Sequence, residues 1–320
     1  MTLYHYFLCC LSLLLVAACE PVVLDPNDPL ENPGPYKTAT RFTAFISNTG
    51  DDNINGRFYY PQTNQASHSQ ALVVLMPGFS VSYRDYERYS LHLASHGIVV
   101  LAFDFLNTSS DSADGKHDDK AIQASEAIDH ALTHNSIGSL INADKIAAMG
   151  HSLGGKIAFY AASQDERIKA VVALDPSNAG GPPCFISPNN CANYPVAPNP
   201  SRGHTGVLMH VQAASLIFRS RPDLTNPAEE FNASYFYFGD DGNGNNAVPE
   251  PAFYINMGDA AHASYVPTMP GFVPAISRRN ALAWLQTVFN GTDNSSYFTG
   301  SKMQQDINAG RVVGYQSRGY

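Results

Sequence analysis

The chain has 320 residues, of which 44% are hydrophobic and 15% are charged, and it shows no internal repeat. This length suits one sizeable α/β domain or two small ones. The formal net charge of -9 at pH 7 includes no run of lysine or arginine, so nothing in the sequence indicates a nucleic acid or an anionic membrane as partner.

The chain starts with MTLYHYFLCCLSLLLVAACE, whose apolar stretch over residues 7–18 is too short to span a bilayer. It predicts a signal peptide over residues 1–18 and an exported protein, although no lysine or arginine precedes the stretch. The run VAAC at residues 16–19 resembles the lipobox of bacterial lipoproteins, which implies a lipid on Cys19; cleavage after Ala18 without lipidation is the alternative. Because Glu20 rather than Asp follows the cysteine, the resemblance implies the outer membrane, whereas an unlipidated chain would be periplasmic or secreted.

Residues 21–35, PVVLDPNDPLENPGP, are rich in Pro, Asp and Asn and show no periodicity. We therefore expect residues 19–36 to be an extended, solvated tether and residues 37–320 to be the folded domain. Cys184 and Cys191 lie in a loop rich in Pro and Asn, and in an oxidising compartment they predict a disulfide. A zinc site would need more soft ligands nearby than this loop offers, and we expect no metal or cofactor.

The predicted elements alternate between strand and helix along the chain. Strands are expected over 41–48, 54–60 and 71–76, then a helix with Tyr86, Tyr89 and Leu93 on one face that ends at Gly97. Next come a strand over 98–103, a helix near 118–134, a strand over 145–149, a helix from Ser152, strands over 168–174, 207–211 and 252–256, and a helix over about 276–290. This order predicts a doubly wound, mostly parallel sheet with helices on both faces.

The connections 175–206 and 212–251 are long for this architecture, and we expect them to form walls of a substrate cleft. The second contains GDDGNGNN (239–246), which lacks the spacing and the terminal Glu of a helical-hairpin calcium loop. A solvated turn is the better interpretation of that segment.

Residues 149–156, MGHSLGGK, fit two motifs that both need a strand before them and a helix after them. A phosphate-binding loop requires Ser or Thr after its lysine to hold magnesium, and here Ile157 follows Lys156. The pattern G-x-S-x-G instead needs small residues at both ends of a sharp strand-to-helix turn, which Gly150 and Gly154 supply. The sequence therefore predicts a nucleophile elbow, with Ser152 as nucleophile beside His151.

A serine nucleophile in this setting requires an acid and then a histidine later in the chain. His262 follows the last predicted parallel strand and precedes the final helix, where the base is expected; His204 and His210 are rivals that precede that strand, and His151 lies too close along the turn to act as base.

The acid must be held near a strand end so that it can accept the histidine N–H. Asp175 directly follows its strand and is favoured, with a helix N-cap as its alternative role. Asp223, about ten residues past the strand predicted over 207–211, is the alternative acid, and Asp240 or Asp241 lies further on.

Ester hydrolysis also needs backbone N–H donors for the tetrahedral oxyanion. One is expected from Leu153, which follows the nucleophile, and the other from the loop after the third strand, where we select Phe79.

From about residue 40 to 291 the chain resembles the α/β-hydrolase serine esterases, in the branch with chlorophyllases, platelet-activating-factor acetylhydrolases and cutinase-like polyester hydrolases. The segment VVLMPGFSVSYRDYERYSLHLASHGIVVLAFDF (73–105) looks very like the polyester hydrolases, with Phe79 at their aromatic oxyanion position. The later segments GHSLGG, ALDPSN and PAFYINMGDAAH are similar to chlorophyllases and the acetylhydrolases, whose acid occupies the position of Asp175. The polyester hydrolases place their acid after the following strand and carry a Trp where this chain has Ser177.

The resemblance implies a monomeric serine ester hydrolase that needs no cofactor, with residues 37–320 as its catalytic domain and a soluble or polymeric ester as substrate. Two alternatives stay open: depolymerisation of a solid polyester, and an inactive envelope-binding lipoprotein that keeps the fold. Contact with a membrane is expected only through the N-terminal lipid.

Overall fold

A computed structural model describes residues 24–50, 52–63, 68–106, 117–177, 210–221, 248–268 and 271–320. Several of the residues singled out above lie outside these ranges, namely residues 1–18, Cys19, Cys184, Cys191, His204, Asp223, Asp240 and Asp241.

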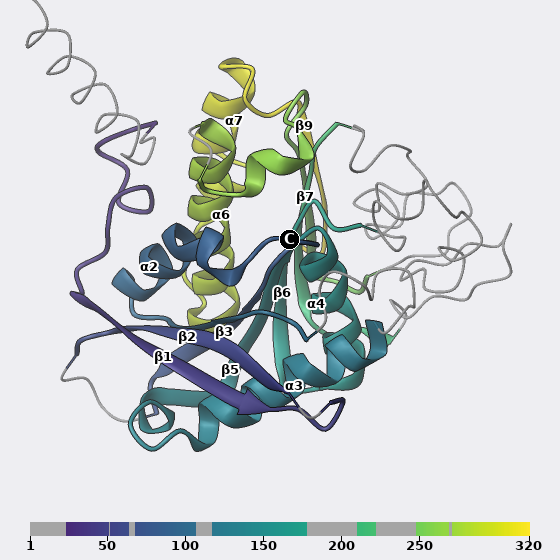
Figure 1. The fold of residues 1–320 in the computed structure, drawn as a ribbon. Helices are drawn as coiled ribbons and strands as arrows, with labels where there is room; N and C mark the ends of the chain where they lie inside the picture. The colour runs from purple at the N-terminus through teal and green to yellow at the C-terminus, as the bar shows by residue number, and fades with distance from the viewer. Residues whose placement is uncertain are drawn as a thin grey trace, which may run out of the picture.

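In the described residues a nine-stranded sheet has the order β1-β2-β4-β3-β5-β6-β7-β8-β9 (Figure 1). The strands are β1 (Thr38–Ile46), β2 (Asn53–Pro61), β3 (Gln70–Met76), β4 (Val99–Phe103), β5 (Ile141–His151), β6 (Ile168–Leu174), β7 (Ala214–Arg219), β8 (Ala252–Asn256) and β9 (Gly314–Arg318). Strands β3 to β8 are parallel to their neighbours within that group, whereas β1, β2 and β9 add antiparallel pairs at the two edges. This confirms the doubly wound, mostly parallel sheet.

Helices cover both faces of the sheet, as Figure 1 shows. Leu72, Val74 and Met76 of β3 pack in one core layer with α3 (His117–Thr133) and α4 (Leu153–Gln164). Val73 and Leu75 point to the opposite layer, which contains α2 (Glu87–Ser95) and α6 (Phe272–Asn290). Because successive side chains of a strand alternate between faces, a wholly buried and almost entirely apolar strand such as β3 needs a helical layer on each side.

Strand β7 lies elsewhere than the sequence predicts. The strand predicted over 207–211 is wrong, because residues 210 and 211 are outside any strand and the partner of β6 is Ala214–Arg219. The two stretches VLMHV (207–211) and ASLIFR (214–219) are similarly apolar and of strand length, so periodicity does not show which of them is the strand. The structure shows it, because residues 170–174 pair with 214–218. The connection predicted over 212–251 therefore contains β7.

The C-terminal region adds a further helix and strand that the sequence did not predict. Helix α7 (Ser301–Asn308) follows the short 3₁₀ turn η8 (Ser295–Tyr297), and β9 then pairs with β8. The pattern of β9 is mostly polar and exposed, because it is an edge strand, and it therefore lacks the apolar run by which a buried strand is recognised. Tyr315 of β9 stacks on Phe253 of β8 with ring centroids 5.4 Å apart.

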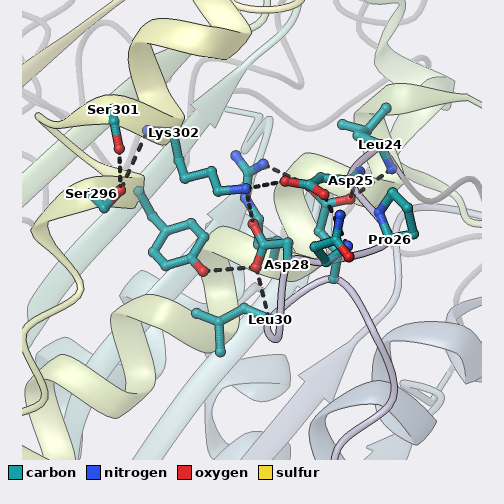
Figure 2. A network of polar contacts seen from close by, with 12 residues as sticks. Leu24, Asp25, Pro26, Asp28, Leu30, Ser296, Ser301 and Lys302 are labelled. Carbon is teal, nitrogen blue, oxygen red and sulfur yellow. Dashed lines mark hydrogen bonds and ion pairs between the residues drawn. The ribbon is translucent and has the colours of Figure 1, made fainter.

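Residues 24–36 differ from the extended, solvated tether that their composition predicts. Asp28 and Glu31 are 1% and 2% exposed, and they bond residues of η8, α7 and α6. Figure 2 shows the part of this network around Asp25, Asp28 and Lys302. Lys302 of α7 pairs with Asp25 at 2.5 Å and with Asp28 at 3.1 Å, and the Tyr297 hydroxyl donates to Asp28 at 2.7 Å. We call residues 24–32 the N-terminal clasp.

Candidate active site

The elbow between β5 and α4 presents Ser152 in a strained backbone conformation. Its φ is 54° and its ψ is -116°, backbone angles that residues other than glycine rarely adopt outside functional sites. A methyl group on Gly150 would overlap the backbone of Gly154, and one on Gly154 would overlap the carbonyl of Met76 at the end of β3. Only glycine therefore fits at these two positions, which is the physical requirement of G-x-S-x-G.

Backbone hydrogen bonds place Ser152 beside the carboxyl end of β6. Its N–H donates to the Leu174 carbonyl at 3.0 Å, and its own carbonyl accepts from the N–H of Ser177 at 3.2 Å. Asp175 lies between those two partners in the sequence, so the nucleophile and the favoured acid are held by the same short stretch of chain.

Asp175 is completely buried and is held from several sides. The Ser220 N–H donates to its Oδ1 at 2.9 Å, and its Oδ2 accepts from the Ser220 hydroxyl and from His262 Nδ1. Burial alone would raise the pKa of this carboxyl, but the charge of His262 and the hydrogen bonds from His262 and Ser220 outweigh it, and the pKa lies below its ordinary value. Asp175 is therefore an ionised acceptor fixed toward the histidine.

His262 opens the 3₁₀ turn η7 (His262–Tyr265) just after β8, and it is 6% exposed. Its Nδ1 meets Asp175, which leaves Nε2 as the ring nitrogen for proton transfer. The ring of His151 lies against it with centroids 4.7 Å apart, so His262 is next to the residue that precedes the nucleophile. The rival His210 is exposed.

The loop after β3 lies directly on the elbow. A methyl group on Gly78 would approach Ser152 Cβ to 3.4 Å and His151 Nδ1 to 3.1 Å. Phe79, the next residue, is half-buried against the core layer of α3 and α4, and Leu153 is the first residue of α4. The first N–H groups of a helix have no partner within the helix and carry partial positive charge, which suits the Leu153 N–H to an oxyanion. Both expected oxyanion donors are on segments that adjoin Ser152.

Lys156, the lysine of the alternative phosphate-loop motif, is completely buried in the first turns of α4. Its ammonium lies 5.9 Å from the centre of the Tyr160 ring, and burial lowers its pKa well below the usual range. A phosphate-loop lysine must reach a ligand in solvent, and Lys156 does not.

Two site residues were not found by reasoning from the sequence. Ser220, which donates to Asp175 twice, directly follows β7 and would have been a candidate had that strand been placed correctly. Tyr86 was assigned only to a helix face, yet its hydroxyl lies 2.7 Å from His151 Nδ1.

Among the described residues, no group of His, Cys, Asp or Glu side chains is arranged to hold a metal ion. Within the same part of the chain, every helix is too short or too polar to cross a membrane.

Comparison with known proteins gives matches over about half of the chain. Residues 29–182 match a family model described as PET hydrolase-like. The chain is 34% identical to cutinase est1 of Thermobifida alba over 166 residues, which are 50% of this chain and 52% of that protein. It is 30% identical to the bis(hydroxyethyl) terephthalate hydrolase of Streptomyces coelicolor over 145 residues, 45% of this chain and 44% of that protein. The chain thus spans about half the length of these relatives, and the family match includes Ser152 and Asp175 but ends before His262.

Proposed function

We propose that this α/β-hydrolase, which resembles the cutinase-like polyester hydrolases, is a carboxylic ester hydrolase that acts through Ser152, His262 and Asp175. The observation that carries the proposal is the buried contact between Asp175 and His262 Nδ1, held beside an elbow whose glycines admit no side chain. The names of the relatives add support, because each denotes an enzyme that cleaves ester bonds.

In the proposed reaction His262 Nε2 removes the proton of the Ser152 hydroxyl as its oxygen attacks the ester carbonyl carbon. The N–H groups of Phe79 and Leu153 stabilise the oxyanion that forms. His262 then gives its proton to the departing alcohol, which leaves an acyl-Ser152 intermediate. Water, deprotonated by His262, attacks that acyl group, and the carboxylic acid departs as Ser152 recovers its proton.

The electrostatics of Asp175 support this role. A carboxylate with a lowered pKa remains charged at neutral pH, and burial strengthens its interaction with the imidazolium that forms during each proton transfer. The two Ser220 donors keep the carboxylate oriented while it carries that charge.

The primary experiment compares Ser152→Ala with Ser163→Ala, which removes a hydroxyl near the other end of α4. We expect Ser152→Ala to abolish labelling by a fluorophosphonate probe and to lower kcat on p-nitrophenyl esters by about a million-fold with the fold intact. Ser163→Ala should retain both labelling and activity. Wild-type protein that is not labelled, or Ser152→Ala activity within about tenfold of wild type, would refute the mechanism and favour a binding protein that keeps the fold.

The second candidate function is hydrolysis of a solid polyester, favoured by the match to the PET hydrolase-like family. Clearing of a polymer film compared with cleavage of soluble p-nitrophenyl esters of increasing acyl length separates the two substrate classes. A soluble-ester enzyme cleaves the short esters and leaves the film unchanged.

The proposal extends to export and to the loop cysteines. We infer that residues 1–18 are removed, that Cys19 carries lipid and that Cys184 pairs with Cys191. Cys19→Ser should release the mature protein from membranes, and an unmodified, soluble wild-type protein would contradict the anchor.

Alkylation of the denatured mature protein without reductant should leave Cys184 and Cys191 unlabelled; two labelled thiols would contradict the disulfide.

A further inference from the structure

The hydroxyl of Tyr86 lies between the loop after β3 and His151, the residue that precedes the nucleophile. Tyr86 ends the 3₁₀ turn η1 (Tyr83–Tyr86) and is 1% exposed. Its oxygen accepts the Gly78 N–H at 3.3 Å and lies 2.7 Å from His151 Nδ1. Nothing in the turn itself requires these contacts, since apolar packing alone would accept Phe at this position.

The proton positions in this chain of bonds follow from what each partner can do. His151 Nε2 is 2.9 Å from the His262 carbonyl oxygen, which only accepts, so Nε2 carries the proton. Burial, followed by the charge of His262, lowers the pKa of His151 to about 3, so the ring is neutral at neutral pH and Nδ1 accepts. The Tyr86 O–H therefore donates to Nδ1.

The result is a continuous relay: Gly78 N–H to Tyr86, Tyr86 O–H to His151, and His151 Nε2–H to the His262 carbonyl. Each member is buried, and each donor in it meets an acceptor. The relay joins three segments that are far apart in sequence: the loop after β3 that carries Phe79, the elbow that carries Ser152, and the turn η7 that carries His262.

We propose that Tyr86 and His151 are positioning residues that hold the oxyanion loop, the elbow and the histidine turn in register for ester cleavage. The inference rests on the proposed function. Tyr86 acts through His151 and Gly78, and neither Tyr86 nor His151 exchanges a proton with the substrate. Its physical basis is that catalytic groups misplaced by about 1 Å can lose about a hundredfold in rate, and buried hydrogen bonds restrict such displacement.

Tyr89 provides a matched control for Tyr86. It is also 1% exposed, it lies three residues further along, and its hydroxyl bonds the Ser277 hydroxyl at 2.5 Å rather than any of the three segments. Tyr86→Phe and Tyr89→Phe each delete one buried hydroxyl; the first leaves two former partners, Gly78 and His151, and the second leaves one, Ser277. A purely structural role predicts a lower melting temperature for both variants and no difference between them in kcat.

The experiment measures kcat, KM and melting temperature of both variants on a soluble p-nitrophenyl ester. We expect a fall in melting temperature for both variants, a loss of about tenfold or more in kcat for Tyr86→Phe with KM nearly unchanged, and kcat within about twofold of wild type for Tyr89→Phe. Histidine ¹⁵N NMR should show His151 protonated at Nε2, and Tyr86→Phe should move its Nδ1 resonance to that of a nitrogen without a hydrogen bond. Equal kcat in the two variants, or His151 protonated at Nδ1, would overturn the proposal.

Failure of the relay and failure of the proposed function give different results. If the fluorophosphonate probe labels the wild-type protein and Tyr86→Phe is as active as Tyr89→Phe, the positioning role of the relay is refuted and the proposed function is not. Wild-type protein that is neither labelled nor active refutes the proposed function and, with it, any positioning role in ester cleavage.

Discussion

At the scale of single residues, Asp175 combines burial of a charged group with a strained backbone, and both are energetically unfavourable. It is completely buried, and its φ of 45° lies in the left-handed region that most residues avoid. The conformation aims the carboxylate at both Ser220 and His262, so the strain and the loss of hydration are offset by hydrogen bonds to a charged group.

Substitution of the two candidate acids distinguishes their roles. Asp175→Asn keeps the shape but cannot stabilise the imidazolium and favours the wrong histidine tautomer, which in a related triad costs about 10⁴-fold in kcat. We expect a loss of several orders of magnitude for Asp175→Asn, whereas Asp223→Asn should stay within about tenfold of wild type. Steady-state kinetics on a soluble ester measures both. The reverse pattern would assign the acid to Asp223, as in the polyester hydrolases, and would make a polymer the leading substrate.

The sequence allowed the elbow and the histidine to be selected but left the acid open, and the reason is local. Gly150 and Gly154 are steric requirements, and steric requirements are visible in a motif. The argument against Asp223 used a strand over 207–211; with β7 ending at Arg219, Asp223 follows it much more closely. What favours Asp175 is then a long-range contact with His262, and no local pattern encodes such a contact.

At the scale of elements, the packing of α4 against β3 depends on Gly154. A methyl group there would overlap the Met76 and Pro77 carbonyls, which are backbone atoms that cannot rotate away, whereas one on Gly271 just before α6 would meet none of the described residues within 4 Å. We expect Gly154→Ala to lower the free energy of unfolding by about 3 kcal/mol or more, and Gly271→Ala to change it by less than about 1 kcal/mol. Urea denaturation measures both, and a Gly154→Ala protein as stable as Gly271→Ala would contradict the close approach.

His92 of α2 gives the interface between α2 and α6 a defined dependence on pH. Burial, and then the charge of Arg278 on α6, lowers its pKa to about 2. As the pH falls below about 6.5, the unfolded chain therefore binds a proton that the folded protein refuses, and stability is lost progressively toward pH 2.

We expect His92→Gln to reduce the pH dependence of the free energy of unfolding by about 1.4 kcal/mol per pH unit between pH 4.5 and 6. Above pH 7.5 the difference from wild type should be constant, which separates titration from lost packing. Parallel stability curves across the whole range would mean that His92 is not buried in its neutral form.

The elements that the sequence predicted well are those with a strong apolar pattern and glycine or proline at their ends, such as β3, β4 and α2. Those it missed, β9 and α7, are polar surface elements whose stability comes from contacts with β8 and with the N-terminal clasp. Such contacts depend on residues distant in the sequence. From composition alone, the residues of the clasp were predicted to be a solvated tether.

At the scale of the whole molecule, the N-terminal clasp links the start of the folded chain to its end. Arg279 of α6 is 2% exposed and lies between Glu31 Oε1 at 2.9 Å and Asp306 Oδ2 of α7 at 2.5 Å. Glu31 Oε2 also accepts the N–H groups of Leu24 and Asp25 at 2.7 and 2.9 Å. Arg279 of α6 thus bonds both the clasp and α7, and Glu31 is the clasp residue that holds it.

We expect Glu31→Gln to destabilise the protein by about 3 kcal/mol, because it leaves the buried Arg279 with one carboxylate fewer. Asp25→Asn, which alters the more exposed pair with Lys302, should leave the denaturation midpoint close to that of wild type. Limited proteolysis should cleave near residues 24–32 earlier in Glu31→Gln than in either other protein. Identical proteolysis and midpoints in all of them would show that the clasp is not fastened through Glu31.

The clasp also limits how far the folded domain can lie from the N-terminal residues that precede it. If Cys19 carries the lipid, only the residues up to Leu24 separate the bilayer from the fastened chain, and five residues extend at most about 17 Å. So short a linker would keep the domain close to the membrane and would prevent it from adsorbing on a distant solid surface. Small esters would diffuse to it, whereas a polymer particle would have to touch the cell envelope itself.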